Sequence, residues 1–406
     1  VTYAEFGARA NSIADQLRDL GVTKGDHVGY LGENHPTFVE ALFAVTQLGA
    51  IFVPLNTRLA APEISFILQD AGIKVLFASP DLLATAKTAA EGSHVEKLVV
   101  TAAGLDSVES NVASIKAEEP ARFIEVPVSP EDIALILYTS GTTGQPKGAQ
   151  LSHKNLIWNA FNVLVDYDIT SREIALMISP MFHAAALGMG VLPVILKGGT
   201  LVIEEGFNAE KVLRLIPEHK ITFMSGVPTT YKMLSEHPDW EAADLSSIRT
   251  LTCGGSPASL RVIEEYERRG LSFTGGYGLT EASPGVSSLQ TQHSRSKIGS
   301  AGLPHFFVDF RLNLGIGSDQ GDGPTGEIEI RGENVTPGYW NRPTENKQAY
   351  TEDGWFKTGD IARLDKDGFI FIADRLKDMI ISGGENVYPA EVEAQILLLE
   401  GISDVA

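Results

Sequence analysis

The sequence predicts an α/β fold with largely parallel sheets, helices on both faces of those sheets, and a β-rich part toward the C-terminus. Up to about residue 297, short and uniformly apolar runs alternate with segments of helical periodicity, which is typical of buried parallel strands joined by helices. Beyond that point polar and apolar residues alternate and turn sequences separate the runs, which indicates antiparallel hairpins. Helical periodicity returns at Pro389.

The alternation can be followed element by element. Apolar residues recur at helical spacing over residues 4–20 and 36–48, and an apolar run of strand length lies between them. The strands expected in the α/β part are 28–31, 51–53, 74–78, 133–138, 175–178, 201–203, 221–224 and 250–253. In the β-rich part we expect strands at 307–314 and 327–331, with a hairpin turn at Asp365–Gly368.

Size and composition exclude several classes of protein. With 406 residues the chain can form two or three structural units, and its net charge of -20 argues against a nucleic-acid partner, which would require a basic face. Cys253 is the single cysteine, so we expect no internal disulfide, no metal site built on cysteines and a reducing, cytoplasmic location. The most apolar stretch, 184–196, is shorter than a bilayer span and contains Pro193, so we expect it in the core, with no transmembrane segment and no secretory signal.

A glycine- and hydroxyl-rich segment, Tyr138–Gly148, carries the strongest chemical signal. It follows an apolar strand and precedes a helix that we expect to begin near Ser152. Glycines let backbone N–H groups curl inward, and the hydroxyls and Lys147 add donors and charge, as a phosphate cradle requires. The segment differs from the P-loop pattern, because Gln-Pro separates Gly144 from Lys147 and a glycine follows the lysine. The competing interpretation is a polar surface loop.

This segment resembles the phosphate-binding signature of the adenylate-forming superfamily, which includes acyl-CoA synthetases, aryl-CoA ligases, peptide-synthetase adenylation domains and luciferase. Other segments match in the order that the family has. They are Met181–His183 (the acyl-pocket motif), Gly276–Glu281 (adenine and magnesium), Thr358–Asp360 (ribose), and Asp374–Asp378 with Ser382–Pro389 (hinge). The matches cover nearly the whole chain and are most similar to bacterial fatty-acyl-CoA synthetases.

The resemblance implies a domain organisation. It implies a large adenylate-forming domain over residues 1–374, with two α/β-layered sheets in 1–297 and a β-rich part in 298–374. Residues 375–406 would then be the hinge and the beginning of a small α+β C-terminal domain, most of which this sequence lacks; the alternative is that the rest of the domain exists in the native protein. Because no residue matches the family's adenylation lysine of that domain, we expect the chain to bind nucleotide but to form acyl-CoA slowly.

The resemblance also implies an activity: ATP-dependent activation of a carboxylic acid through an acyl-adenylate, with transfer to coenzyme A. A carboxylate is a poor acylating agent, and its attack on the α-phosphate of ATP brings two anions together, so cations and hydrogen-bond donors are needed at the phosphates. By resemblance, Lys147, Thr280 and Glu281 are catalytic, Glu281 holds Mg²⁺ and Lys377 is the hinge. The residues assigned to ATP or AMP are Thr139, Ser140, Gly141, Thr142, Thr143, Gly144, Gly254, Gly255, Ser256, Tyr277, Gly278, Asp360 and Arg375. Those assigned to the acid are His183, Gly276 and Pro284.

Several of these residues have a simpler interpretation when taken alone. An aspartate after glycine, as at Asp360, is often a turn or cap residue, and Arg375 beside Asp374 is often a surface ion pair. A single histidine in an apolar run, such as His183, is often a hydrogen-bonded core residue, and we assign it to pocket lining rather than acid–base work. Gly254–Ser256 could be only a strand-to-helix turn. Their positions after the other motifs favour the functional assignments.

The resemblance narrows the acid by exclusion. Amino-acid-activating relatives carry an aspartate at the position of His183, and malonate-activating relatives carry an arginine at that of Gly276, so the sequence disfavours both substrates. The small residues that follow His183 leave room for an apolar chain or an aryl ring, or serve close helix packing equally well. Two other functions stay open: loading a carrier protein, which we consider less favoured than coenzyme A, and a non-catalytic nucleotide- or acyl-binding module.

Overall fold

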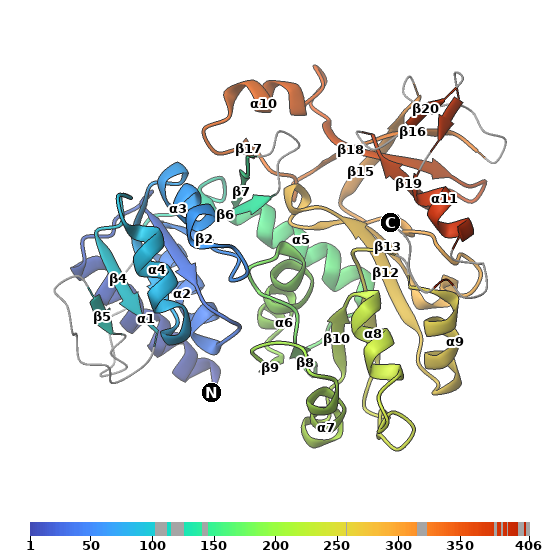
Figure 1. The fold of residues 1–406 in the computed structure, drawn as a ribbon, viewed down its shortest axis with the longest axis horizontal. Helices are drawn as coiled ribbons and strands as arrows, with labels where there is room; N and C mark the ends of the chain where they lie inside the picture. Colours follow the sequence, from blue (N-terminus) through green and yellow to red (C-terminus); the bar gives the residue numbers. More distant parts are fainter. Residues whose placement is uncertain are drawn as a thin grey trace.

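The computed structural model describes residues 1–101, 112–114, 126–139, 145–256, 258–314, 323–376, 380–382, 385–387, 389–396 and 402. Two largely parallel sheets lie side by side with helices between and around them, and an antiparallel sheet sits beyond the second one (Figure 1). The expected α/β class with a β-rich part is confirmed.

The first sheet has the strand order β17-β7-β6-β2-β1-β3-β4-β5. Its strands are β1 (His27–Leu31), β2 (Ile51–Pro54), β3 (Ile73–Ala78), β4 (Lys97–Val100), β5 (Val112–Ser114), β6 (Ile133–Thr139), β7 (Lys147–Ser152) and β17 (Gly338–Tyr339). Strands β6 to β5 are parallel, whereas β7 and β17 add antiparallel strands at one edge. That edge carries the glycine-rich segment.

Helices cover both faces of this sheet because successive strand residues are buried on opposite sides. The helices are α1 (Tyr3–Asp19), α2 (Pro36–Gln47), α3 (Ala61–Asp70), α4 (Leu83–Ala90) and α5 (His153–Tyr167). In β2, Phe52 faces α1, α2 and α5, while Val53 faces α3 and α4. A capping box between Thr2 and Glu5 begins α1, and Ser152 with Asn155 begins α5 at the predicted place.

The second sheet has the order β14-β13-β12-β11-β10-β8-β9. Its strands are β8 (Ile174–Met177), β9 (Thr200–Ile203), β10 (Phe223–Gly226), β11 (Thr250–Cys253), β12 (Phe273–Gly278), β13 (Gly285–Leu289) and β14 (Leu303–Pro304). Strands β12 to β9 are parallel. One face shares the core of α5 with the first sheet, and the other packs on α7 (Ala209–His219), α8 (Pro228–Ser235) and α9 (Leu260–Arg268).

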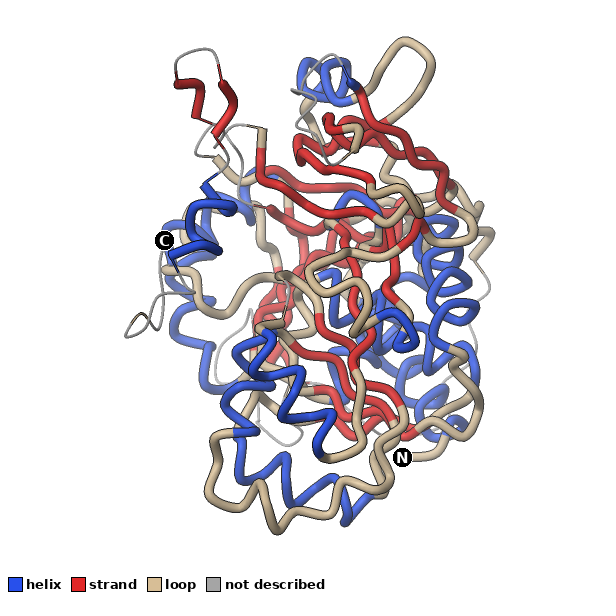
Figure 2. The backbone as a smooth tube through the Cα atoms, turned by 90° about the vertical axis from the view of Figure 1, so that its right-hand side faces the viewer, coloured by secondary structure: helices blue, strands red, loops and turns tan. Residues whose placement is uncertain are grey.

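The β-rich part forms an antiparallel sheet of order β15-β16-β18-β19. Its strands are β15 (Val308–Asn313), β16 (Thr325–Gly332), β18 (Phe356–Leu364) and β19 (Ile370–Arg375). The predicted Asp365–Gly368 turn joins β18 to β19, with Asp365 accepting from the backbone of Phe369. Helix α10 (Pro343–Ala349) follows β17, and β20 (Ile380–Ser382), β21 (Glu385–Val387) and α11 (Pro389–Ile396) are the last elements of the described residues. Figure 2 shows the strands gathered in the middle of the molecule with helices on either side of them.

Two strands differ from the sequence prediction. Strand β7, which contains Lys147, was not expected, because we placed the helix directly after the glycine-rich segment. Strand β10 begins two residues later than expected. The apolar stretch 184–196 is a π-helical turn at Ala186–Val191 followed by α6 (Leu192–Lys197), and none of the helices in the described ranges is long and apolar enough to cross a membrane.

Candidate active site

The two ends of the glycine-rich segment are held together by the β6–β7 ladder. Thr139 pairs with Lys147, and the Thr139 hydroxyl donates 3.5 Å to the Lys147 carbonyl. Because β6 runs parallel to β2 and antiparallel to β7, Thr139 and Lys147 both lie at the edge of the sheet where the parallel strands end. The assigned residues Ser140, Gly141, Thr142, Thr143 and Gly144 lie outside the described residues.

Lys147 and Glu281 converge on one aromatic ring. The Lys147 ammonium lies 5.6 Å from the centroid of the Tyr339 ring, and the Tyr339 hydroxyl donates 2.8 Å to Glu281 Oε1. Glu281 lies in the 3-10 turn Thr280–Ala282, which contacts β7. The structure therefore brings together two of the catalytic assignments, with Thr280 adjacent in the chain to Glu281.

Buried asparagines fix the turn that follows Glu281. Asn334 donates from Nδ2 to the carbonyls of Ala282 and Gly285 at 2.7 and 2.8 Å. Asn159 of α5 accepts from the Gly285 amide at 2.9 Å and donates to the Gly188 carbonyl at 2.8 Å. Both asparagines are fully buried, so these bonds satisfy backbone groups that water cannot reach. The sequence analysis missed them.

Strand β12 presents the adenine motif with little room for side chains on its glycines. A Cβ added at Gly276 would meet the Ser287 carbonyl of β13, and one at Gly278 would meet the Pro284 carbonyl. The glycine at 276 is therefore required by strand packing, in addition to any role in leaving space for the acid. Pro284, assigned to the acid, thus lies close to Gly278, assigned to the nucleotide.

Tyr277, Asp360 and Arg375 form one cluster between β12, β18 and β19. The Tyr277 hydroxyl donates to Asp360 Oδ2, and Arg375 Nε lies 3.4 Å from Asp360 Oδ1. Burial raises the pKa of Asp360, and the Tyr277 hydrogen bond and the Arg375 charge only partly offset that effect. Burial, together with the Asp360 charge, raises the pKa of Tyr277, so its phenol stays protonated.

Gly254, Gly255 and Ser256 lie at the carboxyl end of β11, next to β12. The Gly254 amide donates to the Gly226 carbonyl at 3.1 Å, and Gly255 has φ of 84°, a conformation that favours glycine. The residues are half-buried or exposed, as a nucleotide-facing edge requires. Carboxyl ends of parallel strands are where α/β sheets bind ligands.

His183 shortly precedes a π-helical turn at Ala186–Val191, and Gly188 in that turn lies against Pro284. The His183 ring packs on Phe182 but stays exposed, and partial desolvation together with the Arg58 charge lowers its pKa. A Cβ at Gly188 would meet the Ser283 carbonyl and Pro284 Cδ. At Gly188 the small residue therefore serves close packing, one of the two alternatives raised by the sequence.

The residues present suit a magnesium ion that is shared with a nucleotide. In the described ranges no group of three or more His, Cys, Asp or Glu side chains could hold a metal ion by itself. Mg²⁺ needs no such cage, because it commonly takes one or two carboxylates and completes its shell with phosphate and water oxygens. The buried Glu281 carboxylate, beside Lys147 and the phosphate segment, fits that arrangement.

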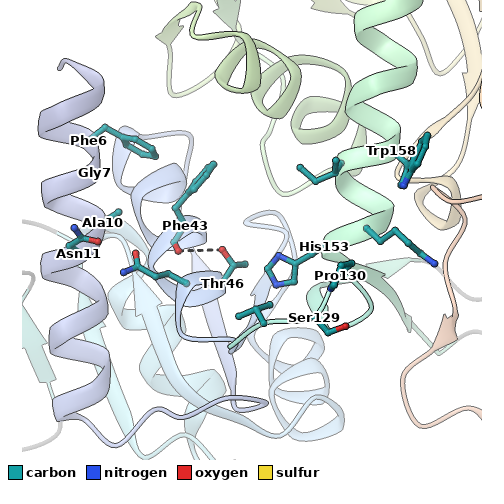
Figure 3. A pocket seen from close by; sticks show the side chains of 14 residues that line it. Phe6, Gly7, Ala10, Asn11, Phe43, Thr46, Ser129, Pro130, His153 and Trp158 are labelled. Atoms are coloured by element: carbon teal, nitrogen blue, oxygen red, sulfur yellow. Dashed lines mark hydrogen bonds between the residues drawn. The ribbon is translucent and has the colours of Figure 1, made fainter. Parts of the chain in front are cut away.

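A cavity of about 850 Å³ lies elsewhere, between α1, α2 and the beginning of α5 (Figure 3). Phe6, Phe43 and Trp158 are among its lining residues, with His153 and Lys154. Strand β7 separates the cavity from Lys147 by its full length, roughly 17 Å. It is distinct from the nucleotide motifs. Lys377, assigned as the hinge, lies outside the described residues.

Comparisons with known proteins identify the family. The family model described as "AMP-binding enzyme" matches residues 1–340. A feruloyl-CoA synthase from Amycolatopsis sp is 47% identical over 407 residues, covering 100% of this chain and 80% of that protein. A long-chain-fatty-acid–CoA ligase from Mycobacterium tuberculosis is 38% identical over 408 residues, covering 100% of this chain and 79% of that protein.

A solved structure shows the same fold with ligands bound. The o-succinylbenzoate coenzyme A synthetase from Bacillus subtilis, in complex with ATP and magnesium ion, superposes with a TM-score of 0.86 at 32% identity, covering 100% of this chain and 81% of that one. The family match, these identities and the arrangement of the motifs agree. The chain belongs to the AMP-binding enzyme family, and to the acid–CoA ligases within it that these relatives represent.

Proposed function

We propose that the protein activates an apolar, aryl-substituted carboxylic acid with ATP and transfers the acyl group to coenzyme A. The observation that carries this proposal is that one short segment contributes a residue to each of two chemically different clusters. Tyr277 joins Asp360 and Arg375, and Glu281, four residues later, lies with Tyr339 and Lys147. The first cluster suits a nucleoside and the second suits phosphates.

The first step is adenylation. A carboxylate oxygen of the acid attacks the α-phosphorus of ATP, the bond from that phosphorus to the bridging oxygen breaks, and pyrophosphate leaves with the electron pair. Lys147 and the Thr280 hydroxyl would stabilise phosphoryl charge, and Glu281 would hold Mg²⁺. The metal, when bound, neutralises phosphate charge. Such interactions strengthen as charge moves, so they act on turnover more than on binding.

The nucleoside is held apart from the phosphates. Asp360 can accept hydrogen bonds from both ribose hydroxyls, and Arg375 can add a donor. The ring of Tyr277 would pack on adenine, beside the backbone of Gly254, Gly255 and Ser256. Because this contact is common to ATP and AMP, it would retain the acyl-adenylate after pyrophosphate leaves.

The second step forms the thioester. The thiolate of coenzyme A attacks the carbonyl carbon of the acyl-adenylate, the carbon–oxygen bond to phosphate breaks, and AMP leaves with that oxygen. Gly276, Pro284 and His183 would border the acyl group. Cys253 does not compete as a thiol acceptor, because burial raises its pKa to about 12 and it stays protonated.

The acid is inferred from relatives and packing together. The more similar of the two relatives is named a feruloyl-CoA synthase, and the turn after His183 is closely packed at Gly188 rather than hollow. Both favour a compact aryl acid. A long-chain fatty acid is the second candidate, because the 38% identical relative is named for it. The cytoplasmic location and the preference for coenzyme A over a carrier protein stay predictions.

A substrate panel tests this function. The protein is incubated with ATP, Mg²⁺ and coenzyme A together with hydroxycinnamic acids, saturated fatty acids, α-amino acids or dicarboxylic acids, and thioesters are measured by mass spectrometry. We expect the highest rate with a hydroxycinnamic acid, and a Glu281→Gln variant should release pyrophosphate at least tenfold more slowly. A preference for amino acids or dicarboxylates would contradict the proposal, as would a Glu281→Gln variant with unchanged pyrophosphate release.

A further inference from the structure

Tyr339 contacts the site from outside every segment that carries a motif. Its hydroxyl donates 2.8 Å to Glu281 Oε1, and its ring faces the Lys147 ammonium 5.6 Å away. It is half-buried, and a phenol, whose ordinary pKa is about 10, is a neutral donor at pH 7. A neutral donor orients a carboxylate without cancelling the negative charge that a cation needs.

The fold fixes the position of Tyr339 through its backbone. In β17, Tyr339 pairs with Ala149 of β7, two residues after Lys147. Asn346 of α10 accepts from the Tyr339 amide at 2.6 Å and donates to its carbonyl at 2.9 Å. Gly338 has φ of 140°, and a Cβ there would collide with Asn346, so glycine permits this clamp.

The same segment also holds the backbone of Glu281. The Thr336 amide donates to the Glu281 carbonyl at 2.7 Å, and the Thr336 hydroxyl donates to the Gln150 carbonyl of β7 at 2.6 Å. Glu281 is therefore anchored at its main chain and at its side chain by residues 336–339. Strand β17 thus connects strand β7, which contains Lys147, to the Glu281 carboxylate.

We propose that Tyr339 is a positioning residue: its hydroxyl fixes the orientation of the Glu281 carboxylate for a divalent cation, and its ring holds Lys147 apart from that carboxylate. The inference rests on the proposed function, because it takes Glu281 as the metal-holding group. The ring between cation and anion prevents an ion pair that would neutralise both. Groups that orient metal-holding side chains commonly change metal affinity by about 10- to 100-fold when removed.

The test measures metal dependence apart from catalysis. Binding of ATP to Tyr339→Phe is measured by calorimetry over a series of Mg²⁺ concentrations, and binding of AMP is measured without metal. We expect the Mg²⁺ concentration at half-maximal ATP binding to rise about tenfold. Affinity for metal-free AMP should stay unchanged, because that contact lies in the Tyr277 cluster. An unchanged Mg²⁺ midpoint would overturn the inference.

Two further variants control for structure. Tyr3→Phe removes a phenol that donates 2.8 Å to the Gly199 carbonyl, which takes no part in anchoring Glu281, and its Mg²⁺ midpoint should match the parent protein. Tyr339→His keeps a ring and an N–H donor, so its midpoint should rise less than that of Tyr339→Phe, and it serves the comparison if Tyr339→Phe does not fold. Equal rises in all three variants would mean a general packing effect and would contradict the inference.

A double substitution separates this inference from the proposed function. In a Glu281→Gln background, Tyr339→Phe should add no further rise in the midpoint. If Glu281→Gln alone leaves Mg²⁺-dependent ATP binding intact, the metal assignment of the proposed function is wrong. If Glu281→Gln raises the midpoint and Tyr339→Phe does not, only the role of Tyr339 is wrong.

Discussion

Asp360 carries its negative charge at a place where little solvent reaches it. It is 7% exposed, and the hydroxyl of Tyr277 and the guanidinium of Arg375 are its partners. A ribose that supplies two hydroxyl donors would satisfy the carboxylate further, and the charge makes those bonds strong. Ribose binding would therefore offset part of the free-energy cost of burying the Asp360 charge.

Asp360→Ala should weaken ATP and AMP alike, by about 2–4 kcal/mol, because the ribose contact is common to both and does not involve the metal. Calorimetric titration with each nucleotide measures the effect. Glu352→Ala removes the same charge from an exposed position and should leave both affinities unchanged. Parent-like AMP affinity in Asp360→Ala would remove Asp360 from the nucleotide site.

As the pH is lowered, AMP affinity should begin to fall at a higher pH than it would if Asp360 had the pKa of an ordinary aspartate. Burial raises the pKa of Asp360, so protonation begins above the usual aspartate range near 3.9, and a protonated carboxyl cannot accept from both ribose hydroxyls. For stability the sign is opposite: the neutral form is the better tolerated one when folded, so this group favours folding below about pH 3.9 and loses that contribution as pH rises through its raised pKa. Titrations of AMP across pH 4–8 should show the affinity loss in the parent protein. In Asp360→Asn only the dependence that belongs to the AMP phosphate, whose second pKa is about 6, should remain, and an unchanged pH profile would assign the loss to another group.

At the scale of single elements, the π-helical turn after His183 is packed against the cluster that holds the adenine motif. Gly188 contacts the Ser283–Pro284 backbone, and Asn159 joins the Gly188 carbonyl to the Gly285 amide. Asn159 of α5 therefore links the turn to the beginning of β13. Through these hydrogen bonds, the segment assigned to the acid is joined to the segment assigned to the nucleotide.

Gly188→Ala should destabilise the protein by about 1–3 kcal/mol, because the added methyl group meets backbone atoms that cannot rotate away. Gly206→Ala is the matched control: nothing lies within 4 Å of its Cβ position, and it should change the free energy of unfolding by less than about 0.5 kcal/mol. Denaturant unfolding measures both. Equal stabilities would mean that the turn has free space and that a bulkier acid pocket must be considered.

Elements with a strong local signal were predictable from the sequence. Strand β11 occupies the predicted residues 250–253, since an apolar run there is bounded by a charged residue and by glycines. Strand β7 was missed because its residues alternate weakly and it pairs antiparallel at a sheet edge, which depends on the fold of β6 rather than on its own pattern. The hydrogen bond from Tyr339 to Glu281 spans 58 residues, and no local pattern predicts it.

Some residues of the candidate site were likewise predictable from the sequence, and others were not. Tyr277, Asp360 and Arg375 were assigned by resemblance of short motifs, and the fold places them in contact. Asn159, Asn334 and Tyr339 act through tertiary hydrogen bonds to backbone or to another side chain, so residue type and spacing alone gave no signal for them. Supporting residues of this kind require the structure.

At the scale of the whole molecule, the site lies where the three sheets meet. Strand β7 of the first sheet supplies Lys147, β12 of the second supplies Tyr277, and β18 of the third supplies Asp360. The first two sheets share a core around α5, and the third sheet packs on β13 of the second, so a nucleotide would bind where connected cores meet. The proposed reaction at this site passes through an acyl-adenylate.

Isotope transfer tests that claim most directly. A hydroxycinnamic acid with ¹⁸O at both carboxylate oxygens is incubated with the protein, ATP, Mg²⁺ and coenzyme A, and the products are analysed by mass spectrometry. Because the attacking carboxylate oxygen becomes the bridge to phosphorus and stays there when the thiolate displaces AMP, we predict one ¹⁸O atom in AMP for each thioester formed, and none in pyrophosphate. Labelled inorganic phosphate accompanied by ADP, or thioester formation with unlabelled AMP, would contradict the account.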